Sequence, residues 1–204
     1  MPIPQAVVFD LGKVLLDFDY GRTARAMAAQ CALNEQEIAA ALLQTTLLHR
    51  YETGLMTTAE FFLELKQVTR FRHGFAAFAG LFADIFDPIP EMIALNERLR
   101  SHGIPTYIFS NTNELAIQHI RSAYPFFANF SGYIYSYEHR SMKPDPVIYQ
   151  AVESLTGRAG PELLYIDDRP ENIAHGAERR WQTIHHTGHR ETIARIGRIW
   201  VLDK

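Results

Sequence analysis

Short apolar runs alternate with longer stretches of helical periodicity along most of the chain. A run without polar alternation is typical of a strand buried on both faces of a parallel sheet. Strands that alternate with helices predict an α/β fold with right-handed crossovers. The strands predicted in this way lie at residues 6–9, 105–109, 133–136, 163–166 and 182–185. The helices predicted between them lie at residues 91–101, 114–123, 146–156 and 173–180.

The segment between residues 17 and 87 interrupts this alternation, because its periodicity is helical over most of its length. A capping-box pattern opens a predicted helix at residues 34–48, and a second helix is predicted at 59–68. Phenylalanines at three- and four-residue steps from Phe71 to Phe86 form one apolar helical face, which is more typical of packing than of a cofactor site. The two predicted domains are an α/β core of residues 1–16 and 88–204 and an inserted helical cap of residues 17–87.

Composition and charge narrow the range of functions. The chain has 204 residues, of which 47% are hydrophobic and 21% charged, as in ordinary globular proteins. A net charge of -3 gives no electrostatic basis for binding nucleic acid or an acidic membrane, and no apolar run approaches the roughly 20 residues that span a bilayer. The single cysteine, Cys31, and the absence of a signal-like segment favour a cytoplasmic protein. Nothing in the sequence requires more than a monomer.

Polar side chains follow the predicted strands where each strand ends. Asp10 follows the first strand, Ser110 the second, and the pair Asp167 and Asp168 follows the strand at 163–166. These ends meet at one edge of a parallel sheet, where ligands bind. Adjacent buried acids are unfavourable unless they are paired or bound to a metal, and carboxylate oxygens beside a phosphate suit Mg²⁺. Phosphate oxygens could be held there by the serine hydroxyl, backbone N–H groups and a lysine such as Lys143.

Each of these features has a simpler interpretation when it is taken alone. Asp10 could cap a turn, the segment 110–113 could cap a helix, and Lys143 could be a solvated surface charge. The acid pair after an apolar strand is harder to explain in this way. Four such features in a fixed order favour a phosphate-binding and metal-binding site.

The order of these motifs resembles that of the haloacid dehalogenase superfamily. The matching residues are Asp10-x-Gly12, Ser110-Asn111-Thr112, Lys143-Pro144, and Asp167-Asp168 with Asn172. The match is closest to the branch that holds sugar-phosphate phosphatases of the glucose-1-phosphatase type and the N-terminal phosphatase domain of soluble epoxide hydrolase. The insert resembles the helical cap of that branch, including the pattern from Tyr51 to Gly54. The resemblance implies a Rossmann-like parallel-sheet core with an inserted α-helical cap.

The same resemblance implies an activity and a role for each motif residue. The protein would be a Mg²⁺-dependent phosphatase of small phosphorylated metabolites, most closely sugar phosphates. Asp10 would attack phosphorus and form an aspartyl-phosphate, and Lys143 would neutralise charge on Asp10 and on the phosphoryl group. The phosphoryl oxygens would be bound by Ser110, by the N–H groups of Asn111 and Thr112, and by Lys143.

The resemblance also implies a ligand set for the metal. Mg²⁺ would be held by Asp10, the backbone carbonyl of Gly12 and Asp168. Asp167 would be either a further ligand or a residue that supports the others. Asn172 would brace the acidic loop.

The sequence departs from most phosphatases of the superfamily at Gly12, where they carry a second aspartate that acts as general acid and base. General acid–base catalysis contributes about 10²–10⁴-fold to a rate. The resembled branch shares this glycine. The acid could instead come from Asp17, Asp19, His49 or Glu52, and Lys13 could add positive charge near the leaving oxygen.

Two alternative functions follow from these motifs. A 2-haloacid dehalogenase attacks carbon, needs no metal and lacks the adjacent acid pair. Asp167-Asp168 and Lys143-Pro144 therefore favour the phosphatase. A catalytically weak phosphate-binding or regulatory module is supported only by the loss of the acid at Gly12.

Overall fold

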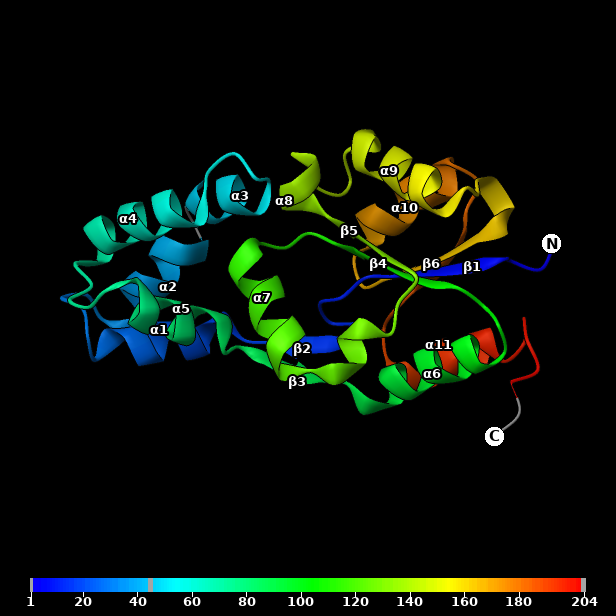
Figure 1. Ribbon diagram of the computed structural model, residues 1–204, viewed down its shortest axis with the longest axis horizontal. Helices are drawn as coiled ribbons and strands as arrows, with labels where there is room; N and C mark the ends of the chain where they lie inside the picture. The colour runs from blue at the N-terminus through cyan, green and yellow to red at the C-terminus, as the bar shows by residue number, and fades with distance from the viewer. Residues whose placement is uncertain (1, 44–45, 203–204) are drawn as a thin grey trace.

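The computed structural model describes residues 2–43 and 46–202. In this part of the chain, five parallel strands form one sheet in the order β5-β4-β1-β6-β7, with β1 at its centre (Figure 1). This arrangement confirms the predicted α/β fold. The strands are β1 (Ala6–Phe9), β4 (Thr106–Ser110), β5 (Gly132–Tyr135), β6 (Leu163–Asp167) and β7 (Gln182–His185).

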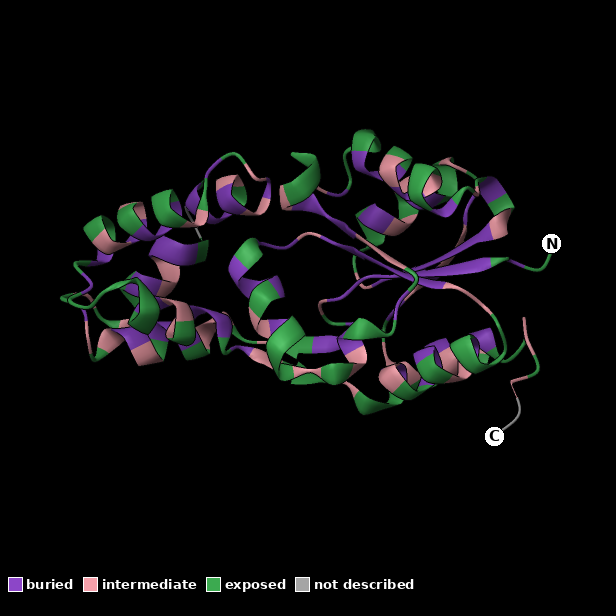
Figure 2. Cartoon of the chain, viewed as in Figure 1, coloured by how far each residue is buried: buried purple, intermediate pink, exposed green. Residues whose placement is uncertain are grey.

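Helices cover both faces of the sheet, which explains why its strands lack polar alternation. Val7 and Phe9 of β1 face one hydrophobic cluster, while Ala6 and Val8 face another. All four side chains are fully buried, and Figure 2 shows the same burial along the central strands. The first face is covered by α6 (Pro90–Ser101), α7 (Glu114–Ala123) and α11 (His189–Ile196). The second is covered by α9 (Pro146–Thr156) and α10 (Pro170–Glu178).

The segment between β1 and α6 carries the helical insert. The chain leaves and re-enters the core through an antiparallel ribbon of β2 (Leu16–Phe18) and β3 (Phe86–Pro88). Between these strands lie α1 (Tyr20–Ala28), α2 (Glu35–Leu43), α3 (Thr46–Glu52), α4 (Thr58–Thr69) and α5 (Phe75–Ala83). They pack around their own hydrophobic cluster and lie beside the core in Figure 1. The exact domain limits stay a prediction, and residues 1, 203 and 204 of the predicted core lie outside the described residues.

Two predictions for the insert were only partly right. The predicted helix at residues 34–48 is resolved as α2 and α3, and residues 44 and 45 lie outside the described residues. Its capping box is present, since Asn34 Oδ1 accepts the Glu37 N–H at 3.0 Å and the Glu37 carboxylate accepts the Asn34 N–H at 2.8 Å. The phenylalanines do not share one helix, because Phe71 precedes α5 and Phe86 lies in β3.

Short elements complete the core and connect it to the insert. They are the 3₁₀ turns η1 (Pro125–Ala128) and η2 (Gly160–Glu162) and the helix α8 (Ser136–His139). The Ser136 hydroxyl donates to the carbonyl oxygen of Glu52 at 2.5 Å, so α8 is bound to the end of α3. Among the described residues, no helix has the length and apolarity needed to cross a membrane.

Gly54 lies in this contact between α3 and α8 and leaves no room for a side chain. Its φ is +70°, and an added Cβ would overlap the carbonyl oxygen of Tyr137. We expect Gly54→Ala to lower the free energy of unfolding by about 2–5 kcal/mol, since a strained backbone and a steric overlap both oppose it. Urea denaturation measures this loss.

Gly103→Ala is the matched control, because Gly103 has a φ of +76° but open space around its added Cβ. It should lose only the backbone contribution of about 1–2 kcal/mol. Equal losses in the two variants would show that the overlap with α8 has no effect on stability.

Candidate active site

The carboxyl ends of the three central strands bring the predicted site residues together. Phe9 pairs with Ile108 and with Ile166, so the residues that follow these positions lie next to one another. A cavity of about 220 Å³ opens at this edge of the sheet. Core residues that line it include Asp10, Gly12, Ser110, Asn111, Thr112, Lys143, Asp168 and Asn172. Residues that line it from the side of the insert include Tyr20, Leu48 and Glu52.

Asp10 is held at the end of β1 by hydrogen bonds on both sides. Its N–H donates to the carbonyl oxygen of Ile166 at 2.8 Å, which continues the β1–β6 ladder. Its Oδ1 accepts the Leu11 N–H at 2.7 Å and Lys143 Nζ at 2.8 Å. Burial raises the pKa of Asp10 to about 7 against the effect of Lys143, and Asp167 adds to the rise. A cation near these acids would favour the ionised form of Asp10.

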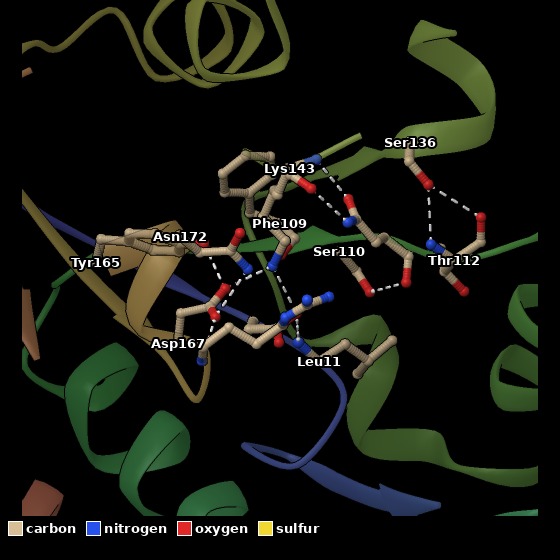
Figure 3. A network of polar contacts seen from close by, with 12 residues as sticks. Leu11, Phe109, Ser110, Thr112, Ser136, Lys143, Tyr165, Asp167 and Asn172 are labelled. Carbon is tan, nitrogen blue, oxygen red and sulfur yellow. Dashed lines mark hydrogen bonds and ion pairs between the residues drawn. The ribbon is translucent and has the colours of Figure 1, made fainter. Parts of the chain in front are cut away.

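Lys143 is buried among the acids and uses each of its ammonium protons. Nζ donates to Asp10 Oδ1 at 2.8 Å, to Asp167 Oδ2 at 2.7 Å and to the carbonyl oxygen of Phe109 at 2.9 Å (Figure 3). Burial disfavours its charge, but Asp10 and Asp167 hold the pKa of Lys143 above its ordinary value. The Asn111 side chain fixes the lysine backbone, since its Oδ1 accepts the Lys143 N–H at 2.7 Å and its Nδ2 donates to the Lys143 carbonyl at 3.0 Å.

Asp167 is fully buried and saturated with donors. Oδ1 accepts the Arg169 N–H at 2.8 Å and Asn172 Nδ2 at 3.0 Å. Oδ2 accepts Lys143 Nζ at 2.7 Å and the Tyr165 hydroxyl. A carboxylate has about four acceptor positions, and these donors occupy them. Burial opposes its ionisation, but Lys143 holds the pKa of Asp167 below its usual value.

The acidic cluster has the composition of a site for a hard divalent cation. Oxygen atoms of Asp10, Asp167 and Asp168 lie within 4.8 Å of one another. These carboxylates face one ammonium group, that of Lys143, so a dipositive ion would balance the local charge. Carboxylate and carbonyl oxygens are the ligands that Mg²⁺ prefers. Asp168 lines the cavity and is only partly buried, whereas the oxygens of Asp167 are already engaged by donors.

The loop after β4 carries the residues expected to bind phosphate. Ser110 is buried, and its hydroxyl donates to the carbonyl oxygen of Asn111 at 3.3 Å. The Thr112 N–H donates to the Ser136 hydroxyl at 2.9 Å, as Figure 3 shows. Thr112 would therefore have to exchange this bond to bind a phosphoryl oxygen as predicted. The Ser110 hydroxyl would likewise have to turn away from the Asn111 carbonyl oxygen to donate to a phosphoryl oxygen.

The structure shows which of the candidate replacements for the acid missing at Gly12 line the cavity and which do not. Asp17 pairs with Lys13, and Asp19 pairs with Arg25 at 2.9 Å. The side chains of both aspartates are more than half exposed, and neither lines the cavity in the described structure. His49 is exposed as well. Of the residues considered from sequence, Glu52 and Lys13 line the cavity.

Sequence reasoning missed several residues of the cavity wall, and two of them, Tyr20 and Arg169, are polar. Tyr20, at the start of α1, donates its hydroxyl to Glu52 Oε1 at 3.2 Å. Its segment carries no motif that could have marked it. Arg169 also lines the cavity, and its position directly after the acid pair is the one indication that the sequence offered.

Together, the fold and this geometry define an α/β protein with a helical insert and an acidic site at the edge of its parallel sheet. The family model for haloacid dehalogenase-like hydrolases matches residues 4–178, and the chain belongs to that family. The superfamily assigned from the motifs is thereby confirmed, and the branch stays a prediction.

Solved structures with the same fold come from several bacteria. The HAD family enzyme BT-2542 of Bacteroides thetaiotaomicron, in complex with magnesium and inorganic phosphate, is 23% identical, with a TM-score of 0.80 over 89% of this chain and 93% of that one. A protein of Porphyromonas gingivalis described as a predicted HAD-like family hydrolase is 22% identical, with a TM-score of 0.81 over 97% of this chain and 99% of that one. The L-2-haloacid dehalogenase of Xanthobacter autotrophicus with chloropropionic acid covalently bound is 18% identical, with a TM-score of 0.65 over 98% and 85%.

Proposed function

We propose that this protein is a Mg²⁺-dependent phosphatase that hydrolyses small phosphorylated metabolites through an aspartyl-phosphate. The observation that carries the proposal is the cluster of Asp10, Asp167 and Asp168 around a single lysine, because its excess negative charge needs a cation. The similar enzyme BT-2542 binds magnesium together with phosphate, which supports the same pairing of ligands here.

The residues of the cavity can perform phosphoryl transfer in two steps. Both donors to Asp10 bind Oδ1, so we assign the attack on phosphorus to Oδ2. Lys143 and the Ser110 hydroxyl stabilise the negative charge on the phosphoryl oxygens as the bond to the leaving oxygen breaks. Water then attacks phosphorus, which releases inorganic phosphate and restores the Asp10 carboxylate. Mg²⁺, when bound by Asp10, Asp168 and the Gly12 carbonyl, would neutralise charge between the carboxylates and the phosphoryl group.

We assign different roles to the two aspartates of the acidic loop, Asp167 and Asp168. Asp167 has its four acceptor positions filled, so we assign it the role of positioning Lys143 and of fixing the loop with Asn172. Asp168 is then the direct metal ligand of the pair.

The cavity limits the substrate to a small polar molecule. Its volume is about 220 Å³, and its wall carries Glu52, Asn113 and Arg169 beside the aromatic ring of Tyr20. These groups suit the hydroxyls of a sugar phosphate or a similar metabolite. Helices of the insert form part of the wall, so binding within it would exclude bulk water from the reaction.

One observation favours a second candidate, a 2-haloacid dehalogenase. A halide leaves without a proton, so a site with Gly12 in place of an acid loses nothing in that reaction. The similarity to the dehalogenase of Xanthobacter autotrophicus is compatible with this chemistry. The excess of carboxylates favours the phosphatase, since no metal is needed in a dehalogenase.

Removal of the metal separates these functions. We expect phosphate release from 4-nitrophenyl phosphate in the presence of Mg²⁺ and a loss of about 10²-fold or more when a chelator is added. Restoring Mg²⁺ in excess should restore the rate. Chloride release from 2-chloropropionate, measured in parallel, should be absent.

Other outcomes have defined meanings. Chloride release that is insensitive to the chelator would replace the phosphatase by the dehalogenase. Saturable binding of inorganic phosphate by calorimetry, without turnover of any ester, would identify a phosphate-binding module.

A further inference from the structure

The space beside Asp10 where most related phosphatases carry a second acid is occupied by an aromatic ring. A Cβ on Gly12 would lie 2.8 Å from Cε1 and 3.3 Å from Cδ1 of Phe18. The ring is fixed in the β2–β3 ribbon, where its centroid lies 6.4 Å from that of Phe86, and 5.7 Å from that of Tyr20. Gly12 and Phe18 together therefore exclude an acid from this side of the site.

A different carboxyl group reaches the same cavity from the insert. Among the described residues that line the cavity, the acidic ones are Asp10, Asp168 and Glu52. Asp10 and Asp168 belong to the acidic cluster assigned to the nucleophile and the metal. Glu52 makes no ion pair with the lysine of that cluster, and it is the acid that remains for proton transfer.

Glu52 is held firmly at the end of α3. Its Oε1 accepts the Tyr20 hydroxyl at 3.2 Å. Its carbonyl oxygen accepts the Ser136 hydroxyl at 2.5 Å. Asn113 directly follows the loop of Ser110, Asn111 and Thr112 that we expect to bind the phosphoryl group. The same Ser136 hydroxyl accepts the Thr112 N–H at 2.9 Å, so the backbone of Glu52 is linked to the phosphate loop.

The surroundings of Glu52 favour its protonated form near neutral pH. Burial raises its pKa to about 7, and the Tyr20 hydroxyl, the neighbouring Asn113 amide and the charge of Arg169 oppose the rise. These groups face it from α1, from the start of α7 and from the loop after β6. An acid with a pKa near the working pH can both donate and regain a proton. Because Tyr20 donates to Oε1, the proton belongs on Oε2.

We propose that Glu52 is the general acid of the reaction, in place of the carboxylate that is absent at Gly12. This inference rests on the proposed phosphatase function. As Asp10 bonds to phosphorus, the bond from phosphorus to the ester oxygen breaks and its electron pair stays on that oxygen. The Glu52 carboxyl donates its proton there, and the alcohol leaves. In the second step the oxygen of water bonds to phosphorus, and the Glu52 carboxylate takes a proton from that water. The bond from phosphorus to Asp10 breaks with its electron pair on the carboxylate, and inorganic phosphate is released.

A pair of esters with different leaving groups tests this role. Phenol is a poor leaving group that needs a proton, whereas 2,4-dinitrophenolate leaves without one. With Mg²⁺ present, we expect Glu52→Gln to lower kcat/KM, which reports the first step alone, by about 10²-fold or more for phenyl phosphate and by about threefold or less for 2,4-dinitrophenyl phosphate. In the unaltered protein, kcat for phenyl phosphate should fall as the pH rises above about 7, where Glu52 loses its proton, and this fall should be absent from the variant.

Glu64→Gln is the matched control, because Glu64 lies on α4 of the same insert and pairs with Arg50 at 3.0 Å outside the cavity. It should leave both rates unchanged. A retained kcat/KM for the dinitrophenyl ester shows that the Glu52 variant is folded.

Several results would overturn the proposal. An equal loss with both esters would mean that Glu52 only maintains the structure of the site. A rise in KM with unchanged kcat would mean that it only binds the substrate, and unchanged rates would mean that it has neither role. If the unaltered protein hydrolysed neither ester, the phosphatase function itself would fail and the assignment of Glu52 would fail with it.

Discussion

Asp10→Asn is expected to abolish turnover of phosphate esters, with a fall in kcat of at least about 10⁴-fold. The amide cannot form the covalent intermediate, and it removes one of the ligands we assign to Mg²⁺. The fold should survive the change, because the asparagine Oδ1 can still accept the Leu11 N–H and Lys143 Nζ, which bind Asp10 Oδ1 at 2.7 and 2.8 Å. It also removes a negative charge from a cluster in which Asp167 and Asp168 remain. Thermal unfolding in a chelator should therefore show no loss of stability.

The measurement combines steady-state rates with mass spectrometry of the peptide that contains Asp10. The unaltered protein, quenched in acid during turnover, should carry phosphate on this peptide, and the variant should not. Asp17→Asn is the matched control, since Asp17 is an exposed carboxylate paired with Lys13 and does not line the cavity. Phosphate on a different residue, or activity retained in Asp10→Asn, would contradict the role of Asp10 as nucleophile.

The sheet could be predicted from the sequence because strands buried on both faces appear as continuous runs of apolar residues. The strands around Val8, Ile108 and Tyr165 are apolar along their length, and no tertiary information is needed to see this. Helices α7 and α9 were predicted with their observed limits. Their first turns are set by local caps, since Asn113 accepts the Ala116 N–H and Asp145 accepts the Val147 N–H.

The elements that were missed depend on contacts between distant parts of the chain. Strands β2 and β3 are three residues long and pair Asp17 with Asp87, so neither carries a pattern of its own. Helix α11 follows a strand end rich in histidine and was not predicted. It is anchored by contacts with the sheet and with α6, such as the hydrogen bond from the Arg195 side chain to the carbonyl oxygen of Thr183.

The candidate site shows the same division. Asp10, Lys143 and the acid pair could be singled out because each stands in a recognisable local motif. The different surroundings of Asp167 and Asp168 could not be predicted from the sequence, because they depend on contacts of Asp167 with the Lys143 ammonium group and the Tyr165 hydroxyl.

Glu52 was one of several candidate acids, because no sequence pattern states which residues of the insert face the core. The sequence also did not indicate that the Phe18 ring fills the space beside Gly12. The motif residues of the core could therefore be located from the sequence, whereas the structure was needed to show which candidate residues of the insert line the cavity.

Lys143→Met is expected to damage both stability and activity, because it removes the positive charge from the centre of the acidic cluster. Lys143 is 5% exposed and lies 2.8 Å from Asp10 and 2.7 Å from Asp167, so both carboxylates would stay buried without a counterion. Breaking a buried ion pair from one side lowers the free energy of unfolding by about 3–5 kcal/mol. The carbonyl oxygen of Phe109 would lose its donor as well. The loss of charge at the reacting phosphoryl group should lower kcat by about 10³-fold.

Urea denaturation in a chelator and then with Mg²⁺ separates the electrostatic cause from a simple packing defect. If uncompensated charge destabilises the variant, Mg²⁺ should stabilise it more than it stabilises the unaltered protein, since the cation supplies part of the missing charge. Lys66→Met is the matched control, because Lys66 donates to the carbonyl oxygen of His73 on the insert at 2.9 Å, away from the carboxylate cluster. Its stability should change by no more than about 0.5 kcal/mol. A Lys143→Met protein with the same stability in chelator and in Mg²⁺, and with unaltered kcat, would show that the cluster around Asp10 neither binds a cation nor depends on its lysine.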